Sequence, residues 1–414
     1  MWVAVPDKEK ETRNIKEMQD VGKMENLEIT IEELKKKGKG EYLLLDIRDE
    51  MSFGYGHLPE AVNVPLEELE NWTPEQKDGD KEVVVYCKKG ITSPEAAEAL
   101  RARGIRAFSL AGGYLNWLMQ SAFSEEAEQE EQRTYLDIEE SIRKKFRKSI
   151  WCKFTKAVRE YELVKEGDCI AVCISGGKDS MLMAKLFQEL KRHNKFPFEV
   201  KFLVMDPGYS PENRQIIEQN AKRLNIPITI FESDIFDAVF EIEKSPCYLC
   251  ARMRRGHLYS KAKELGCNKI ALGHHYDDVI ETILMGMLYG AQVQTMMPKL
   301  HSTNFEGMEL IRPLYLVREE DIKKWRDYND LHFIQCACKF TDTCSTCGGE
   351  NASKRIEVKQ LISKMKETNP FVEGNIFKSV ENVNLSTVIA YKKDGVKHHF
   401  LDDYDNGNHS DMQN

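Results

Sequence analysis

Hydrophobic and polar positions follow the same rhythm twice along this chain. Apolar runs of strand length alternate with segments of helical period over residues 25–119, and the alternation begins again near residue 168. The apolar runs are EYLLLDIR, KEVVVYC and AFSLAGG in the first stretch and DCIAVCIS, FEVKFLVMD, PITIFES and NKIALGHH in the second. Strands that alternate with helices predict parallel sheets covered by helices. We therefore expect an α/β fold with two parallel-sheet domains.

Charge changes sign abruptly between the two stretches. Residues 121–140 carry a net charge of −7 and show no apolar period, whereas residues 141–165 carry +7. In the basic segment, apolar residues recur at helical spacing: Ile142, Phe146, Ile150, Phe154, Val158 and Tyr161. This pattern predicts an acidic linker followed by a basic amphipathic helix. The basic face is either a solvated helix surface or a contact surface for a phosphate backbone.

These changes predict the domain boundaries. We expect an N-terminal tail (1–24), a first domain (25–120), the acidic linker (121–140), a second domain that begins with the basic helix (141–370), and a C-terminal tail (371–414) that wraps or packs on the second domain. The 414 residues suit two to three domains. Because 41% of residues are apolar and 31% are charged, the composition argues against a disordered chain and a membrane protein. We expect a cytoplasmic protein with no membrane association.

Eleven cysteines in such a chain favour metal binding or sulfur chemistry over disulfides, because the cytosol keeps thiols reduced. Cys87 ends a predicted strand, Lys88 and Lys89 follow it, and Pro94 opens a predicted helix. Ligands bind at the carboxyl ends of parallel strands, and nearby lysines and a helix N-terminus favour a thiolate. A cysteine in this setting can carry a persulfide. The structural alternative is a buried thiol packed as a small hydrophobe.

The first domain resembles the rhodanese-like sulfurtransferases. The shared segments appear in the family's order: Leu45 to Arg48, Gly56 to Pro65, the Cys87 loop, and Leu110 to Tyr114 with Trp117. The resemblance implies that Cys87 carries the persulfide and that the loop through Thr92 offers N–H groups to the outer sulfur.

A glycine-rich loop, Ser175-Gly176-Gly177-Lys178-Asp179-Ser180, lies between a predicted strand and a predicted helix in the second domain. Its glycines let backbone N–H groups approach a phosphate, although the Walker A pattern is absent. The loop resembles the pyrophosphatase loop (PP-loop) of the N-type ATP pyrophosphatases. This resemblance implies ATP as a substrate, with Lys178 and the loop holding its β,γ pyrophosphate while a substrate oxygen is adenylated.

Two further strand ends join this predicted site. Asp206 ends the strand FEVKFLVMD, where it would meet the nucleoside, and Gly273 and His274 end the strand NKIALGHH. Asp277 and Asp278 follow, and paired carboxylates beside a triphosphate suggest contact with Mg2+ or its waters. The structural alternative for this pair is a helix N-cap and a first-turn acid.

Two pairs of cysteines in the second domain have metal-ligand spacing. Cys247 and Cys250 lie at a predicted helix start, followed by an arginine-rich turn, and Cys344 and Cys347 repeat the spacing. Four cysteines could form a zinc site, whereas three cysteines on a 4Fe-4S cluster leave one iron free for an external ligand.

The second domain closely resembles the tRNA 2-thiocytidine biosynthesis family. The shared segments are GDCIAVCISGGKDS, CYLCARMRRGHLY, KIALGHHYDD, PKL, IRPL, CSTCG and NIFKSVENV, from about Ile142 to Val383. This resemblance implies an oxygen-sensitive 4Fe-4S cluster, ATP and Mg2+, and a tRNA anticodon-loop cytidine, expected at position 32. Cys247 and Cys250 carry over as cluster ligands. The third is Cys344 when the chains are aligned on Cys-Gly, and Cys336 when they are aligned on the residues before it; we favour Cys344.

We therefore expect a tRNA-cytidine 2-sulfurtransferase in which ATP adenylates O2 of the cytidine and Cys87 persulfide delivers sulfur through the cluster. The catalytic residues expected are Cys87, Lys178, Asp277 and Asp278. The expected partners are tRNA and a cysteine desulfurase or another persulfide donor, with a homodimer as one option. Thiolation of a uridine to 2-thiouridine or 4-thiouridine is the alternative within this class. A rhodanese-type sulfur carrier with a nucleotide-binding regulatory domain is the alternative outside it.

Overall fold

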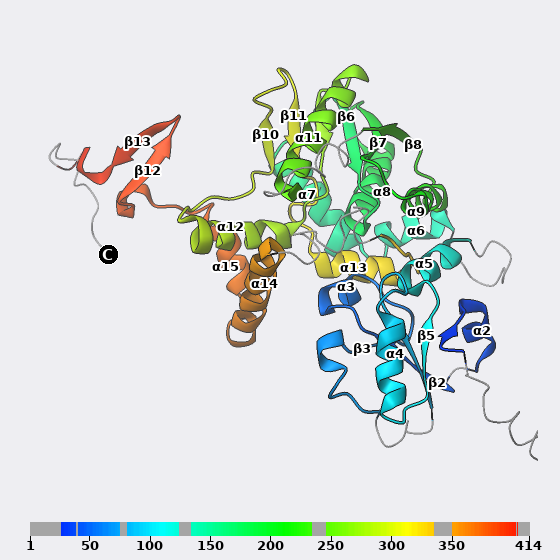
Figure 1. Cartoon of the computed structure of the whole chain (residues 1–414). Coiled ribbons are helices and arrows are strands. Elements are labelled where there is room, and N and C mark those ends of the chain that lie inside the picture. Colours follow the sequence, from blue (N-terminus) through cyan, green and yellow to red (C-terminus); the bar gives the residue numbers. More distant parts are fainter. Residues whose placement is uncertain are drawn as a thin grey trace, which may run out of the picture.

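The computed structural model describes residues 26–38, 40–74, 81–123, 134–233, 246–334, 350–402 and 404. Two parallel-sheet α/β units lie one above the other in Figure 1, which confirms the predicted fold class. Among the described helices, none combines the length and the apolar character that a membrane crossing requires.

The first sheet has five strands in the order β1-β5-β4-β2-β3, and all of its neighbours run parallel. Val83, Val84 and Val85 of β4 are fully buried, because helices cover both faces of a parallel sheet. The elements are β1 (Glu28–Ile29), α2 (Ile31–Lys36), β2 (Tyr42–Asp46), α3 (Glu50–Tyr55), β3 (Val62–Asn63), η1 (Leu66–Glu68), β4 (Glu82–Tyr86), α4 (Ser93–Ala102), β5 (Ala107–Leu110) and α5 (Gly113–Phe123).

The second sheet has six strands in the order β10-β11-β9-β6-β7-β8, and β10 alone pairs antiparallel. Its predicted strands and helices all form. The elements are β6 (Cys169–Ile174), α8 (Lys178–His193), β7 (Glu199–Asp206), α9 (Pro211–Arg223), β8 (Ile228–Glu232), α11 (Pro246–Glu264), β9 (Lys269–Ala271), α12 (Tyr276–Gly290), β10 (Lys299–His301), β11 (Glu309–Ile311) and α13 (Glu319–Tyr328).

The segment before this sheet differs from the predicted linker and single helix. Helix α6 (Tyr135–Arg143) begins inside the stretch expected to be linker, with a capping box between Thr134 and Asp137. The expected continuous basic helix is divided into α6, a π-helical turn η3 (Arg147–Trp151) and α7 (Cys152–Glu160). Its apolar stripe is nevertheless buried as predicted, from Ile142 to Phe154. Glu139 belongs to the buried side as well, because it pairs with Lys185 of α8 at 2.7 Å.

The C-terminal residues pack on the second domain only in part. Helices α14 (Glu350–Thr368) and α15 (Val372–Ser379) lie against α12, where Phe377 stacks on Tyr276 with ring centroids 4.6 Å apart. The remaining elements are η4 (Leu385–Thr387), η5 (Phe400–Asp402) and a hairpin of β12 (Ala390–Lys393) and β13 (Val396–His399). The hairpin stands apart from both sheets in Figure 1.

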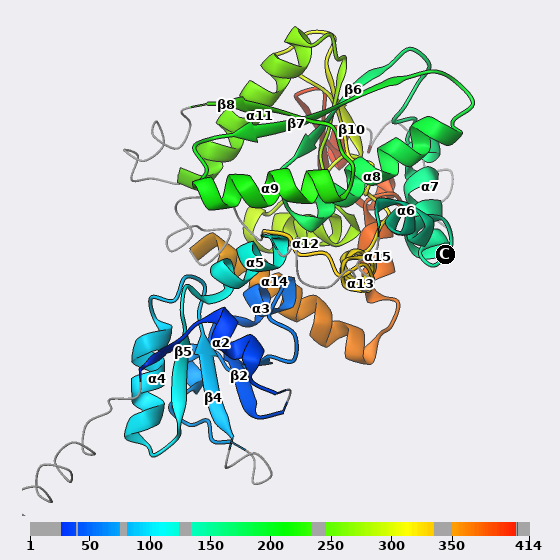
Figure 2. The ribbon, with the colours of Figure 1, turned by 90° about the vertical axis from the view of Figure 1, so that its right-hand side faces the viewer.

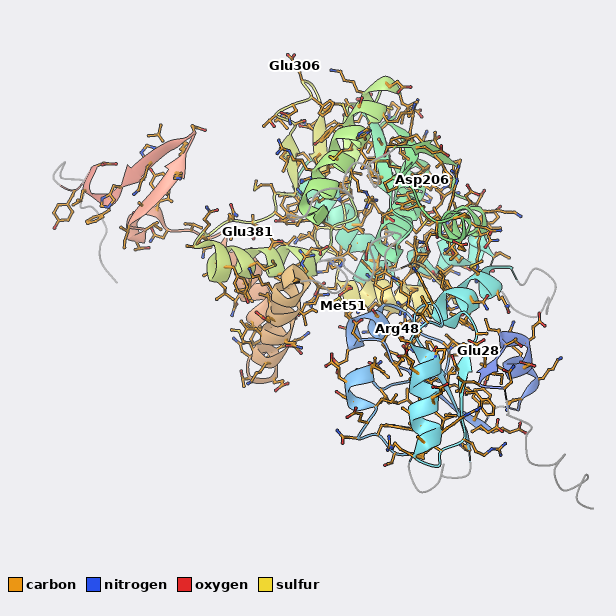
Figure 3. All side chains as sticks on the ribbon, viewed as in Figure 1. Glu28, Arg48, Met51, Asp206, Glu306 and Glu381 are labelled. Atoms are coloured by element: carbon orange, nitrogen blue, oxygen red, sulfur yellow. The ribbon has the colours of Figure 1, made fainter. Side chains whose placement is uncertain are left out.

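The carboxyl edges of the two sheets face each other. Helix α3 follows the carboxyl end of β2, and α8 follows the carboxyl end of β6; the last residue of α3, Tyr55, lies against the first residue of α8, Lys178. Helix α5 packs on α9, and Trp117 meets His332 edge-on at 4.9 Å. Figure 2 shows α3 and α5 between the first sheet and the second domain, and Figure 3 places Arg48 and Met51 at that same end.

Candidate functional site

The Cys87 thiol lies one residue beyond β4, with only 6% of the residue exposed. Its Sγ accepts a hydrogen bond from the Gly90 N–H at 3.1 Å and lies 3.5 Å from the Ser93 hydroxyl. The Ser109 hydroxyl donates to Ser93 at 2.9 Å, which fixes that side chain from the neighbouring strand. The loop therefore surrounds one sulfur atom with donors.

These donors favour the thiolate. Burial alone would raise the pKa of Cys87, but hydrogen bonds from the side chains and N–H groups of Ser93 and Thr92 outweigh it and lower the pKa to about 7. A thiol with this pKa is half ionised at neutral pH, which suits nucleophilic attack on a sulfur donor. The favourable groups are hydrogen-bond donors, whereas the sequence argument gave weight to Lys88 and Lys89.

Glycine is required where the Cys87 loop meets α5. Gly113 has a φ of +59°, and a Cβ there would overlap the carbonyl oxygen of Cys87. The close approach lets the Tyr114 N–H donate to that carbonyl at 2.9 Å. This hydrogen bond joins the Cys87 loop to α5, the helix that packs on the second domain.

The loop from Ser175 to Ser180 is closed by its own hydroxyls. Ser180 Oγ accepts from the Ser175 N–H at 3.1 Å and donates to the Gly177 carbonyl at 3.0 Å. Gly176 has a φ of +86°, and a Cβ there would lie 2.6 Å from Ile217 of α9. The first N–H groups of α8 therefore stand at the carboxyl edge of the sheet, where they favour an anion.

Lys178 is buried at the start of α8 between two carboxylates. Its Nζ lies 3.0 Å from Asp179 and 3.2 Å from Glu319, the first residue of α13. Burial would lower the pKa of Lys178, but Asp179, Tyr55 and Glu319 outweigh it and raise the pKa above its usual range. The ammonium is therefore fully charged and positioned for a phosphate group.

The end of β9 lies directly beside this loop. A Cβ at Gly273 would lie 3.2 Å from the Ser180 nitrogen, so the two backbones approach closely. Burial lowers the pKa of His274 to about 4, so its imidazole is neutral at pH 7. Among the described residues, nothing hydrogen-bonds its buried Nδ1. The end of β9 at Gly273 and His274 therefore lies beside the loop of Ser175 to Ser180, as predicted.

Asp277 and Asp278 are both first-turn acids of α12, whereas the N-cap of that helix is His275. Asp277 accepts from the Glu319 N–H at 2.7 Å and pairs with Arg318 at 2.9 Å. Asp278 accepts from the His275 N–H at 3.0 Å within a capping box, and His275 and Arg355 outweigh burial to lower its pKa to about 2. Both carboxylates lie at the site, and their catalytic role stays a prediction.

Asp206 caps the turn after β7. Its carboxylate accepts from the N–H groups of Gly208 and Tyr209, at 2.9 and 2.6 Å, and pairs with Arg214 at 3.4 Å. It therefore shapes the strand end at which a nucleoside was expected.

The predicted cluster ligands are only partly placed. The backbone at Cys247 and Cys250 lies in the first turns of α11, as expected, but their side chains, Cys344 and Cys336 fall outside what the structure describes. One turn further along α11, Arg254 donates to the Tyr209 hydroxyl at 3.2 Å, beside the end of β7. Among the side chains that are described, no group of three acidic, His or Cys residues could hold a metal ion.

Sequence reasoning missed the residues that cross between segments. Glu319 contacts Lys178 of the loop, and Arg318 contacts Asp277, each from more than forty residues away. Tyr55 contacts Lys178 from the other domain. No local motif marks them, because they act through the packing of α13 and α3.

Comparisons with known proteins agree with both halves of this description. A family model described as a rhodanese-like domain matches residues 30–120, and one described as a PP-loop domain matches residues 146–339. Two solved structures are also similar. The U34-tRNA thiolase NcsA from Methanococcus maripaludis, with its 4Fe-4S cluster, is 21% identical, with 57% of this chain and 78% of that chain covered and a TM-score of 0.46. A rhodanese-related protein from Thermoplasma volcanium is 27% identical, with 22% and 91% covered and a TM-score of 0.20.

Curated relatives align with the second domain. The tRNA-cytidine(32) 2-sulfurtransferase of Vibrio parahaemolyticus is 36% identical over 236 residues, which cover 56% of this chain and 75% of that protein. The enzyme of the same name from Acaryochloris marina is 35% identical over 234 residues, or 56% of this chain and 80% of that protein. These relatives are at least 35% identical to the chain over at least 75% of their own length. The chain is therefore an enzyme of the tRNA-cytidine(32) 2-sulfurtransferase family, and it carries a rhodanese-like domain ahead of the shared region.

Proposed function

We propose that this enzyme replaces O2 of a tRNA cytidine, at position 32 as in the names of its relatives, with sulfur loaded on Cys87. ATP adenylates O2, which releases pyrophosphate and turns the oxygen into part of a good leaving group. The outer sulfur of the Cys87 persulfide then attacks C2, and AMP departs, which leaves that sulfur bonded to both C2 and Cys87 Sγ. A free thiol attacks Cys87 Sγ and breaks the S–S bond, so 2-thiocytidine is released, and a second thiol regenerates Cys87 as the two thiols are oxidised to a disulfide. The expected product is 2-thiocytidine, formed in the cytoplasm, where tRNA is available.

The observation that carries this proposal is that the carboxyl edges of the two parallel sheets face each other. The Cys87 loop and the loop of Ser175 to Ser180 both emerge at those edges, and α3 and α5 of the first domain pack on the second domain there. Hydrogen bonds from its own N–H and from Ser210 lower the pKa of Glu212 at the start of α9, and Lys89, two residues from Cys87, adds a smaller charge effect from the other domain. A sulfur donor and an adenylation site on facing edges favour transfer within one chain.

Cys87 supports the loading step. Its thiolate attacks the outer sulfur of a persulfide donor, such as a cysteine desulfurase; the S–S bond of the donor breaks, and the donor departs as a thiolate. The donors around Sγ, from Gly90, Thr92 and Ser93, stabilise negative charge on the sulfur during this exchange.

Lys178 and the N-terminus of α8 support the adenylation step. The ammonium and the first N–H groups face the place where the β,γ pyrophosphate would lie, and they stabilise the charge that builds on this leaving group. Within the described residues, the buried Oδ1 of Asp179 has no hydrogen-bond partner, so it remains available to Mg2+ that arrives with ATP. The neutral His274 lies beside the same loop.

The cysteine set suits a 4Fe-4S cluster. Cys247 and Cys250 on α11, with Cys344, would supply its three thiolates. The described part of α11 reaches the end of β7, because Arg254 donates to the Tyr209 hydroxyl. When bound, such a cluster supplies an iron site open to a sulfur ligand.

Mass spectrometry of the product nucleosides tests the proposal. Anaerobically prepared enzyme, given a cysteine desulfurase, cysteine, ATP and tRNA, should form 2-thiocytidine. Cys87→Ser should abolish its formation while free sulfide is withheld, and added sulfide should restore it. Thiolated uridine as the product, or full activity of Cys87→Ser without sulfide, would overturn the proposal.

A further inference from the structure

Tyr55 of the rhodanese-like domain occupies the start of α8 in the second domain. Its ring centroid lies 4.8 Å from the Lys178 Nζ. A Cβ at Gly177 would lie 2.7 Å from the Tyr55 hydroxyl oxygen. The phenol therefore lies against the backbone that begins α8 and covers the ammonium that would hold a pyrophosphate.

The end of α3 is held in place from both domains. The Arg326 guanidinium, on α13, donates to the Tyr55 carbonyl. On the other side, Arg48 donates to the Gly56 carbonyl at 2.7 Å and lies over the Tyr114 ring at 4.1 Å. Tyr55 is thus fixed by its backbone as well as by its ring.

The interface around Tyr55 is not fully packed. A pocket of about 250 Å3 remains between the domains, bordered by Tyr55, His57 and Tyr114 on one side and by Arg326 and His332 on the other. Burial raises the pKa of Tyr55 above its usual range, so the phenol is neutral. A neutral phenol satisfies the helix N-terminus and Lys178 less well than the charged phosphates of ATP do.

We propose that Tyr55 is an autoinhibitory plug, which ATP displaces when it binds. The inference rests on the proposed function, namely that the loop of Ser175 to Ser180 holds the pyrophosphate of ATP. While the domains are docked, Tyr55 blocks the place where the pyrophosphate of ATP would bind. ATP takes over the Lys178 ammonium and the start of α8, which releases the end of α3.

Nucleotide affinity of the full-length holoenzyme tests the plug. The ligand is α,β-methylene-ATP with Mg2+, which is not cleaved at the α,β linkage, and binding is measured by calorimetry without tRNA. Because docked chains cannot bind, Tyr55→Ala should bind about tenfold more tightly than the parent. Tyr55→Phe should lie between the two, since it keeps the ring and loses only the hydroxyl.

Matched variants separate the plug from general destabilisation. Arg326→Gln removes the bond to the Tyr55 carbonyl and should also tighten binding. Its control is Arg103→Gln, because Arg103 donates to the carbonyls of Leu69 and Trp72 within the rhodanese-like domain, away from α8. Tyr42→Phe is the control for Tyr55→Phe, since Tyr42 lies in β2 of the same sheet. Neither control should change the affinity.

Hydrogen exchange gives a readout that does not depend on any variant. The nucleotide analogue should speed amide exchange in α3 of the parent protein, because the helix is released. Equal affinity of the parent, Tyr55→Ala and Tyr55→Phe, or unchanged exchange in α3 with nucleotide bound, would overturn the plug alone. Absence of nucleotide binding in every variant would overturn the proposed function and the plug with it.

Discussion

The Cys87 sulfur receives its donors from the turn that follows it and from the start of α4. Because those donors lower its pKa to about 7, the thiolate fraction rises as pH rises through neutrality. We predict that alkylation of Cys87, followed by mass spectrometry of its peptide, increases with pH around a midpoint near 7. Ser93→Ala removes a donor and should move this midpoint upward.

The exposed Cys152, far from this loop along the chain, serves as the internal control. Its alkylation profile should be the same in the parent and in Ser93→Ala. If the Cys87 midpoint stays in place after the substitution, hydrogen bonding from Ser93 is not what favours the thiolate.

Lys178 stabilises the fold as well as the site. It is 2% exposed and faces both Asp179 and Glu319. We predict that Lys178→Ala lowers the free energy of unfolding by about 1 to 3 kcal/mol, because it removes a buried ammonium from two partly buried carboxylates, of which Glu319 keeps Lys359 as a partner. Adding Glu319→Gln should recover part of the loss in chemical denaturation. Purely additive losses in the double variant would contradict the pairing.

At the scale of single residues, the sequence predicted those site residues that belong to a local motif. Cys87, the loop of Ser175 to Ser180 and Gly273 each follow a strand end and lie where expected. Glu319 and Tyr55 could not be predicted in this way, because neither lies in a motif and each reaches the loop only through the packing of its helix.

Among the elements, the basic segment α6, η3 and α7 is the candidate surface for tRNA. Five of its cations form no ion pair with any residue that the structure describes: Lys145, Arg147, Lys148, Lys153 and Arg159. A phosphate backbone that contacts such cations releases counterions, which makes binding dependent on salt. We predict that Lys148→Ala with Lys153→Ala weakens tRNA binding and reduces the slope of log affinity against log salt by about 1 to 2.

The matched control for this surface is a lysine pair on α2. Lys35→Ala with Lys36→Ala removes the same charge from a basic last turn in the rhodanese-like domain. This pair should leave both affinity and slope unchanged. An equal loss in the two double variants would show that only net charge matters, and the proposed surface would be wrong.

Sequence predicted the strands well and the connections less well. Continuous apolar runs define buried parallel strands, so every strand predicted in the two sheets is present. The short strands β1, β3, β10 and β11, the hairpin and the π-helical turn at Arg147–Trp151 were missed. Their two to five residues are too few to show a period, and tertiary contacts determine them.

For the whole molecule, the facing carboxyl edges predict transfer within one chain. Covalent joining keeps the sulfur donor at a high effective concentration beside its acceptor. Cys87→Ser and Lys178→Ala should each be inactive when persulfide is the sulfur source. We predict that an equimolar mixture of the two variants also stays inactive in the nucleoside assay. Activity restored by mixing would show that sulfur passes between copies of the chain.

The most direct test of the account is a single turnover with labelled sulfur. Cys87 is loaded with sulfur-34 persulfide under anaerobic conditions, the donor is removed, ATP and tRNA are added, and a thiol is then added to cleave the S–S bond between the product and Cys87. The account predicts that the label leaves Cys87 and is recovered in 2-thiocytidine, and only when ATP is present. Formation of 2-thiocytidine with unlabelled sulfur, while Cys87 keeps its label, would contradict it.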